Sequence, residues 1–407
     1  MIDFEPSEEQ TLMVTAARQL AEKLRARTRE IEQARALPTD LRETAFEMGL
    51  GGSVAVPETH GGAGLGMVTA VLLEEALASG DAAVPFALSG PGAVGSALTE
   101  LATPEQAQHW MGKLADSTKT GAVAWSEAKP SRERAGFITT ATKEGNDWVI
   151  RGEKAFVLNA EQADVFVVFA QVDVAEGWRG LGAFVVEKSA KGLALRERNT
   201  TLGLDAVGSA SLVLEAVRVP DSARLTPAGD FDRAVLRFFA REGLKVAARC
   251  VGLSQAAFDV ALDYVSNRKA FGKPIGHFQA VAFTLADRAM DVDAARGLVW
   301  RAAAGWDAWA ADGKAASEKE ALRDSAWAIS FALEAAMKAA DDAVQLHGGA
   351  GFMRDYPVEK WMRDAKQMQL CFLTSEQADQ IAAALDIGAP IDPALVLPTP
   401  ETQAVFT

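Results

Sequence analysis

Two glycine-rich stretches are the first candidates for chemistry in this sequence. HGGAGLG (His60–Gly66) and HGGAG (His347–Gly351) could bring backbone amides close to a phosphate. The first stretch does not have the glycine spacing of the dinucleotide fingerprint, and neither lies between a strand and a helix in βαβ order. The sequence also has no Walker-type GKS or GKT and no GxSxG nucleophile elbow. A tight turn between helices is therefore the better interpretation of the first stretch.

Composition narrows the possible partners of the chain. The two cysteines, Cys250 and Cys371, and the four scattered histidines do not have a disulfide or metal-ligand spacing. The formal net charge of −14 argues against nucleic acid or an anionic membrane as a partner. The polar, acidic N-terminus does not resemble a secretory signal, and no apolar run has the length of a membrane span. We therefore expect a cytoplasmic protein of enzyme size, with no metal.

The order of the predicted elements is helices, strands, helices. Ser7 and Gln10 have the capping-box spacing at the start of a helical segment. Short runs rich in Val, Ile, Phe and Thr follow, and helical periodicity then returns. We predict an α+β fold with an N-terminal helical domain (1–118), a central antiparallel β domain (119–228), a C-terminal helical bundle (229–392) and a tail (393–407).

Two segments together resemble signatures of the acyl-CoA dehydrogenase family. They are RKAFGKPIGHFQ (Arg268–Gln279) and QLHGGAGFMRDYPVEKWMRDAK (Gln345–Lys366), and their order, separation and flanking helices also match. FEPSEEQ near the N-terminus and VPETHGGAGLG extend the resemblance over nearly the whole chain. The resemblance implies an N-terminal helical domain, a central β domain and a C-terminal four-helix bundle. It also implies FAD between sheet and bundle, completed by a neighbouring subunit.

The resemblance assigns cofactor contacts to several residues. A guanidinium is well suited to a pyrophosphate, and Arg268 is at the matching position. Glycine permits close approach of the backbone to the adenine-diphosphate half of FAD. The predicted cofactor residues are Ser126 and Phe156 in the β domain, Arg268, Phe271 and Gln279 in the first signature, Gln345, Gly348 and Gly349 in the second, and Thr374 and Glu376 beyond it.

The catalytic base is the main departure from the family pattern. Desaturation of an acyl thioester requires a carboxylate beside the Cα proton. The usual base position corresponds to Phe372, whose side chain cannot accept a proton but whose backbone N–H could serve the thioester carbonyl. Isovaleryl-CoA and long-chain acyl-CoA dehydrogenases carry the base on the helix before the first signature, and the matching residue is Glu242. Glu376 is the rival candidate.

These features predict an FAD-dependent acyl-CoA dehydrogenase that forms a trans-2-enoyl-CoA and passes electrons to an electron-transfer flavoprotein, as a homodimer or homotetramer. Some β-domain motifs differ from the family, for example Leu158, where a hydroxyl near flavin N5 is usual. Two alternatives therefore stay open. The chain could be a degenerate subunit of a heteromeric dehydrogenase, or a cofactor-free interaction protein of the same fold.

Overall fold

The computed structural model describes residues 5–116, 118–128, 136–312 and 317–389. The predicted tail at 393–407 and the last predicted residues of the bundle domain lie outside these ranges.

The N-terminal part of the chain is helical, as predicted. Ser7 caps the first helix, and the Ser7 side chain and Gln10 form both hydrogen bonds of the capping box. Thr103 and Gln106 do the same at the last helix of this part. The helices are α1 (Glu8–Ala26), α2 (Thr28–Ala34), α3 (Thr39–Glu47), α4 (Gly66–Ala78), α5 (Val84–Ala87), α6 (Ala93–Leu101) and α7 (Pro104–Lys113), with one 3-10 turn, η1 (Glu58–His60).

The central part is a seven-stranded sheet that continues directly from these helices. Its strands are β1 (Gly121–Ala124), β2 (Thr140–Glu144), β3 (Asp147–Val157), β4 (Val165–Gln171), β5 (Leu181–Glu187), β6 (Leu193–Leu195) and β7 (Ala210–Pro220), with 3-10 turns η2 (Gly177–Gly180) and η3 (Asp221–Ala223). The spatial order is β1-β4-β2-β3-β7-β6, and β5 pairs with β4.

Most strand pairs of this sheet are antiparallel, in agreement with the predicted β domain. A single residue pair joins β2 to β4 in the parallel direction. The pairs β2–β3, β3–β7, β4–β5 and β6–β7 are antiparallel, whereas β1 lies parallel to β4 along its four residues. The chain passes through β2 and β3 between these two strands, and such a crossover permits the parallel direction that a tight hairpin forbids.

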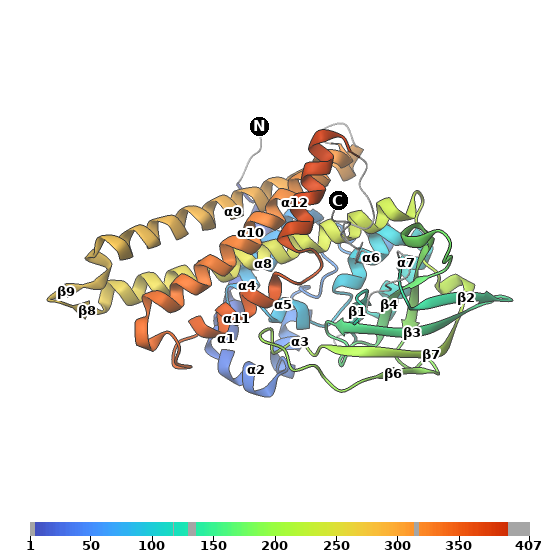
Figure 1. Ribbon diagram of the computed structural model, residues 1–407, viewed down its shortest axis with the longest axis horizontal. Helices are drawn as coiled ribbons and strands as arrows, with labels where there is room; N and C mark the ends of the chain where they lie inside the picture. The colour runs from blue at the N-terminus through green and yellow to red at the C-terminus, as the bar shows by residue number, and fades with distance from the viewer. Residues whose placement is uncertain (1–4, 117, 129–135, 313–316, 390–407) are drawn as a thin grey trace, which may run out of the picture.

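The C-terminal part is the predicted four-helix bundle. Its helices are α8 (Phe231–Asn267), α9 (Gln279–Asp312), α10 (Glu318–Leu346) and α12 (Ser375–Ile387), with the shorter α11 (Val358–Met368) beside them. A small hairpin, β8 (Lys269–Ala270) and β9 (Lys273–Pro274), joins α8 to α9 through the turn η4 (Ile275–His277), and η5 (Gly348–Ala350) follows α10. Figure 1 shows the bundle extending away from the sheet, with the β8–β9 hairpin at its far end.

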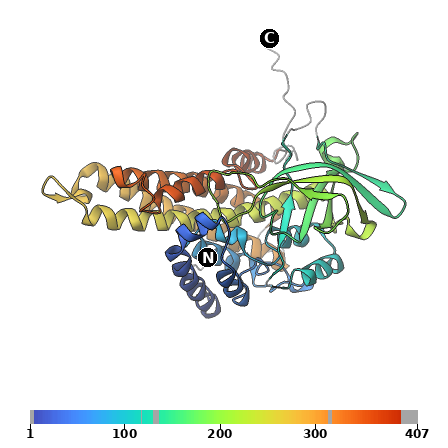
Figure 2. The ribbon, with the colours of Figure 1, turned by 90° about the horizontal axis from the view of Figure 1, so that it is seen from below.

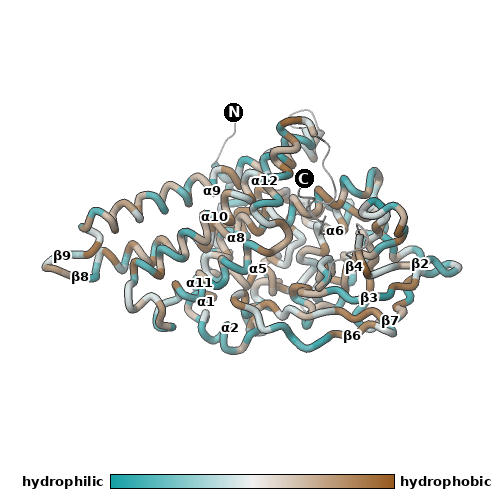
Figure 3. Tube along the Cα trace, viewed as in Figure 1, coloured by the Kyte–Doolittle hydropathy of each residue, from teal (hydrophilic) through white to brown (hydrophobic). Residues whose placement is uncertain are grey.

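Helix α8 is the central element of the molecule. It packs against α4 on one side and α10 on the other, and the N-terminal helices lie along one side of the bundle in Figure 2. Gly252 permits the contact with α4, since a Cβ there would lie 2.2 Å from the carbonyl oxygen of Glu75. Charged residues of α8 are buried as well as apolar ones, although hydrophobic segments dominate the interior in Figure 3.

A buried ionic cluster joins the three parts of the chain. The Lys360 ammonium of α11 lies 2.6 Å from Asp364 and 3.2 Å from Asp81, which precedes α5. The other Asp364 oxygen accepts the backbone N–H of Leu204, from the loop before β7, at 2.6 Å. All three charged side chains are essentially inaccessible to solvent. Each charge in the cluster therefore depends on its partners for stabilisation.

Within the described ranges, no helix has the length and apolarity needed to cross a membrane. The same residues contain no group of three or more His, Cys, Asp or Glu side chains arranged to hold a metal ion.

Candidate active site

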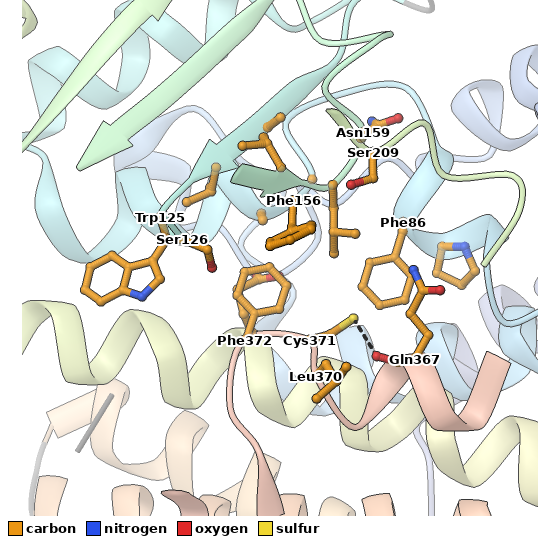
Figure 4. Close-up of a pocket in the computed structure, with 18 of the residues that line it drawn as sticks. Phe86, Trp125, Ser126, Phe156, Asn159, Ser209, Gln367, Leu370, Cys371 and Phe372 are labelled. Carbon is orange, nitrogen blue, oxygen red and sulfur yellow. Dashed lines mark hydrogen bonds between the residues drawn. The ribbon is translucent and has the colours of Figure 1, made fainter. Parts of the chain in front are cut away.

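A cavity of about 460 Å³ lies where the sheet meets the helices. Its walls come from the ends of β1 and β3, from α8, from the segment around α5 and α6, and from the loop between α11 and α12. Aromatic side chains line much of it, and Figure 4 shows several of them facing one another across the space. The aromatic residues of the lining are Phe86, Trp125, Phe156, Phe238, Phe239 and Phe372.

On the sheet side, the cavity lining includes Ser126 and Phe156, the two residues of this part that are predicted to contact flavin. Ser126 lies two residues after the end of β1, and its carbonyl accepts the N–H of Ala155 at 2.8 Å. Phe156 lies at a register shift between β3 and β7, has a left-handed φ of 54°, and is 60% exposed. A bulge of this kind turns a side chain out of the regular strand pattern. Here it presents the Phe156 ring to the cavity, opposite Phe372 (Figure 4).

The loop before α12 forms the facing wall. Phe372 has a φ of 62°, and its ring packs against Phe238 with centroids 6.0 Å apart. A left-handed conformation is costly for a bulky side chain and is typical of functional sites. Phe372, which the resemblance assigns to the usual base position, thus places an aromatic ring at the cavity.

Glu242 lines the cavity from α8 and is 1% exposed. Its carboxylate lies 2.6 Å from the ammonium of Lys245, which also donates to the Ser96 hydroxyl at 2.9 Å. Burial by itself would raise the pKa of Glu242, but the charges of Lys245 and Arg249 and hydrogen bonds from Lys245 and Ser96 lower it overall. Glu242 is therefore ionised at neutral pH, as a base must be, although the same charges reduce its proton affinity.

Arg249 is a second buried charge at the cavity. Its guanidinium donates two hydrogen bonds to Glu74 of α4, at 2.7 and 3.0 Å, and lies 3.9 Å from the centre of the Phe86 ring. The sequence interpretation missed Lys245 and Arg249. A signal for them existed, because residues 242, 245 and 249 have the spacing of one helix face within an otherwise apolar segment.

Two predicted cofactor residues near the start of α12, Thr374 and Glu376, are not part of the cavity lining. Thr374 is the N-cap of α12, and its hydroxyl accepts the backbone N–H of Gln377. Glu376 is in the first turn of α12 and is exposed. The rival candidate base is thus separate from the cavity that Glu242 lines.

Six predicted cofactor residues lie at the opposite end of the bundle. Arg268 is the C-cap of α8, and Phe271, at the tip of the β8–β9 hairpin, is 95% exposed. The end of α10 lies beside them, since the rings of Tyr264 and His347 stack 4.2 Å apart. The others are Gln279 at the start of α9, Gln345 at the end of α10, and Gly348 and Gly349 in η5.

The distance between these two groups is set by helix α8. Glu242 and Arg268 are separated by 26 positions along one helix, which corresponds to about 39 Å. Within one chain, the structure therefore does not bring Arg268 and its neighbours together with Ser126 and Phe156. The two groups would have to contact a common ligand from different copies of the chain.

Sequence models of three successive domains match this chain. They are the N-terminal domain of acyl-CoA dehydrogenase at residues 7–118, the middle domain at 122–217 and the C-terminal domain at 233–385. The chain belongs to the acyl-CoA dehydrogenase family. A glutaryl-CoA dehydrogenase of Mycobacterium smegmatis, solved in complex with FADH2, has the same fold, with a TM-score of 0.82 at 21% identity over 95% of this chain and 96% of that one.

Comparisons with individual relatives of the chain agree with its family membership. An acyl-CoA dehydrogenase of Bacillus subtilis is 34% identical over 91% of this chain and 96% of its own length. The CarC subunit of the caffeyl-CoA reductase–Etf complex of Acetobacterium woodii is 28% identical over 88% of this chain and 92% of its own. The solved butyryl-CoA dehydrogenase of Megasphaera elsdenii superimposes with a TM-score of 0.86 at 29% identity, over 95% of this chain and all of that one.

Proposed function

We propose that this chain oxidises an acyl-CoA thioester to a trans-2-enoyl-CoA, with FAD as cofactor and Glu242 as the base that removes the Cα proton. The observation that carries this proposal is the position of Glu242, a buried ionised carboxylate at the cavity that Ser126 and Phe156 also line. Among the two candidate carboxylates, only Glu242 has this position, because Glu376 is exposed on α12.

The residues at the cavity fit one half of the cofactor. Phe156 offers an aromatic face and Ser126 an exposed hydroxyl, which suit a flat ring system with polar edges. Leu158 supplies no hydroxyl, so the ring would have fewer side-chain hydrogen bonds here than is usual in the family. The chemistry that bound FAD supplies is acceptance of the β-hydrogen as a hydride.

The chain's own residues would perform the proton transfer. Glu242 accepts the Cα proton, and its bonds from Lys245 and Ser96 fix the orientation of the carboxylate. The backbone N–H of Phe372 is our candidate donor to the thioester oxygen, where negative charge develops as the proton leaves. The aromatic walls exclude water, which strengthens these interactions.

A second copy of the chain would complete the cofactor site. The separation of about 39 Å along α8 exceeds the length of an extended FAD molecule. This supports a homodimer, or a homotetramer built from two dimers, in which Arg268 and its neighbours serve the partner's flavin. The CarC relative supports an electron-transfer flavoprotein as the electron acceptor. A cytoplasmic location stays a prediction from the sequence.

The decisive test of the proposal is the absorbance spectrum of the purified protein. We expect flavin bands, and we expect anaerobic addition of one acyl-CoA from a panel of chain lengths to bleach them. A protein that binds no flavin under any reconstitution condition would contradict the proposal and would favour the cofactor-free alternative.

The ion pair between Glu242 and Lys245 favours a second candidate function, that of a flavin-binding subunit without catalytic activity. Lys245 reduces the proton affinity of Glu242, and Phe372 stands at the position where the family usually has its catalytic carboxylate. In that case the flavin bands would persist with every acyl-CoA, and a related second chain would co-purify from the native source.

Lys245→Met should shift the acid limb of the kcat–pH profile to higher pH. Lys245 is the largest influence that lowers the pKa of Glu242, and burial, which raises it, remains in the variant. Because the ionised form is the active one, activity would be lost at a higher pH than in the wild type. Lys319→Met, at an exposed position on α10, is the matched control. An unchanged acid limb in Lys245→Met would contradict the assignment of Glu242 as the titrating base.

Arg268→Ala should weaken FAD retention by about tenfold or more, as expected when a charge-assisted hydrogen bond is lost. The flavin-to-protein ratio after gel filtration measures this effect. Arg151→Ala, an exposed arginine on β3, is the control. Equal flavin content in the two variants would argue against a phosphate contact at Arg268.

A further inference from the structure

Four residues of α8 line the cavity, and their order along the helix runs from one end of the cavity to the other. Phe238 and Phe239 lie at the end where the Phe372 and Trp125 rings pack, with centroid distances of 6.0 and 4.6 Å. Glu242 follows one turn later, and Arg249 lies two turns beyond Glu242. The flavin-contacting end of the cavity is therefore at Phe238, and Arg249 is at the other end of the same helix face.

Arg249 is buried at that inner end but not fully hydrogen-bonded. A guanidinium has five N–H donors. Two hydrogen bonds from Arg249 are present, both to Glu74, so three donors have no acceptor among the described residues. One face of the group is covered by the Phe86 ring. The free donors are accessible at the cavity, since no nitrogen of Arg249 is among the fully buried atoms that lack a partner. Donors left unpaired become costly when a bound apolar group excludes water from them.

This arrangement is unsuitable for the end of a plain hydrocarbon chain. An acyl group whose Cα lies beside Glu242 extends its remaining carbons along α8 toward Arg249. A terminal methyl group at that point would desolvate the free donors without replacing their hydrogen bonds. An oxygen acceptor at the same point would satisfy them.

The charges around Arg249 decide which kind of oxygen fits. Glu242 and Arg249 line the cavity, and each is paired with an opposite charge that is not part of the lining, Glu242 with Lys245 and Arg249 with Glu74. A carboxylate on the substrate would add an uncompensated third negative charge in a buried place. A neutral hydroxyl, keto or amide oxygen would accept the free hydrogen bonds without that charge.

We propose that Arg249 is a specificity-determining residue that binds a neutral oxygen on the distal part of the acyl group, so that the substrate is an oxygen-substituted acyl-CoA. This inference rests on the proposed function, since it takes the cavity as the acyl-binding site.

Binding of unreactive CoA thioethers to the flavin-loaded protein tests the inference independently of turnover. The probes are S-alkyl-CoA compounds with chains of four, six and eight carbons, each compared with its ω-hydroxy and ω-carboxy counterparts by titration calorimetry. At the best-fitting length we expect the ω-hydroxy compound to bind about tenfold more tightly than the plain chain. Arg249→Met, which keeps the bulk and removes the donors, should abolish this preference.

A second variant keeps the test informative if Arg249→Met folds poorly. Glu74→Gln leaves the guanidinium but removes its counter-charge, so the preference should move toward the ω-carboxy compound. Equal binding of plain and ω-hydroxy chains at every length, with acyl-CoA turnover intact, would overturn the inference alone. Tightest binding of the ω-carboxy compound by the wild type would overturn the choice of a neutral oxygen. Failure of every CoA thioether to bind would overturn the proposed function as well.

Discussion

Glu242→Gln should lower kcat by about 10²–10⁴-fold, the contribution typical of a positioned general base. Glutamine has nearly the same shape as glutamate, and its amide oxygen can still accept from the Lys245 ammonium, which lies 2.6 Å from the carboxylate in the wild type. The variant therefore loses the proton acceptor while the surroundings of the residue are kept. Flavin should remain bound, because Ser126, Phe156 and Arg268 are unchanged.

Steady-state turnover with an artificial electron acceptor measures this effect, and the flavin-to-protein absorbance ratio confirms that the cofactor is still bound. Glu376→Gln is the matched control, since it makes the same change at the exposed rival position on α12. A large loss in Glu376→Gln with near-normal turnover in Glu242→Gln would transfer the role to Glu376. Turnover that survives in both variants would exclude both residues as the base.

Lys360→Met should lower the free energy of unfolding by about 3–5 kcal/mol, the usual effect of removing one partner from a buried ion pair. The ammonium of Lys360 is 1% exposed and is the only positive group that bonds both Asp81 and Asp364 among the described residues. Without it, two buried carboxylates lose their main partner. Because this cluster joins α11 to the segment before α5, the loss should reduce the cooperative stability of the whole chain.

Urea unfolding at neutral pH, followed by circular dichroism, measures the change. Lys338→Met, at an exposed position on α10, should stay within about 0.5 kcal/mol of the wild type, as surface substitutions usually do. A similar small effect in Lys360→Met would show that water or rearrangement compensates the two carboxylates. Adding Asp81→Asn and Asp364→Asn to Lys360→Met should recover part of the loss, because no unpaired charge then remains.

The fold could be predicted from the sequence more completely than the candidate active site. Local signals determine the element order, since capping residues, strand-type runs such as VFVVFAQ and the helical periodicity each depend on neighbours in the chain. Glu242 could be placed by counting along one helix from Val251. The partners that lie on other helices could not be assigned in this way, because Ser96 comes from α6 and the Glu74 that neutralises Arg249 comes from α4. These contacts depend on how helices that are far apart in the sequence pack against one another, and a local sequence pattern does not predict that packing.

The departure of β1 from the antiparallel pattern has a similar cause. Its residues Gly121–Ala124 have an ordinary strand composition, and strand direction is not encoded in composition. The direction follows from the route of the chain between β1 and β4. The left-handed backbone of Phe156 and Phe372, both in the cavity lining, was likewise not predictable, since sequence alone gives no reason for such a conformation in phenylalanine.

In the proposed shared cofactor site, the length of α8 would link cofactor loading to association of the chains. If each flavin is held by the sheet of one copy and the bundle tip of another, free FAD binds the assembled state and not the separated chains, and mass action then favours assembly. Dilution should therefore release flavin, and added flavin should oppose dissociation. The holoprotein would behave as a single thermodynamic unit whose melting temperature rises with its own concentration.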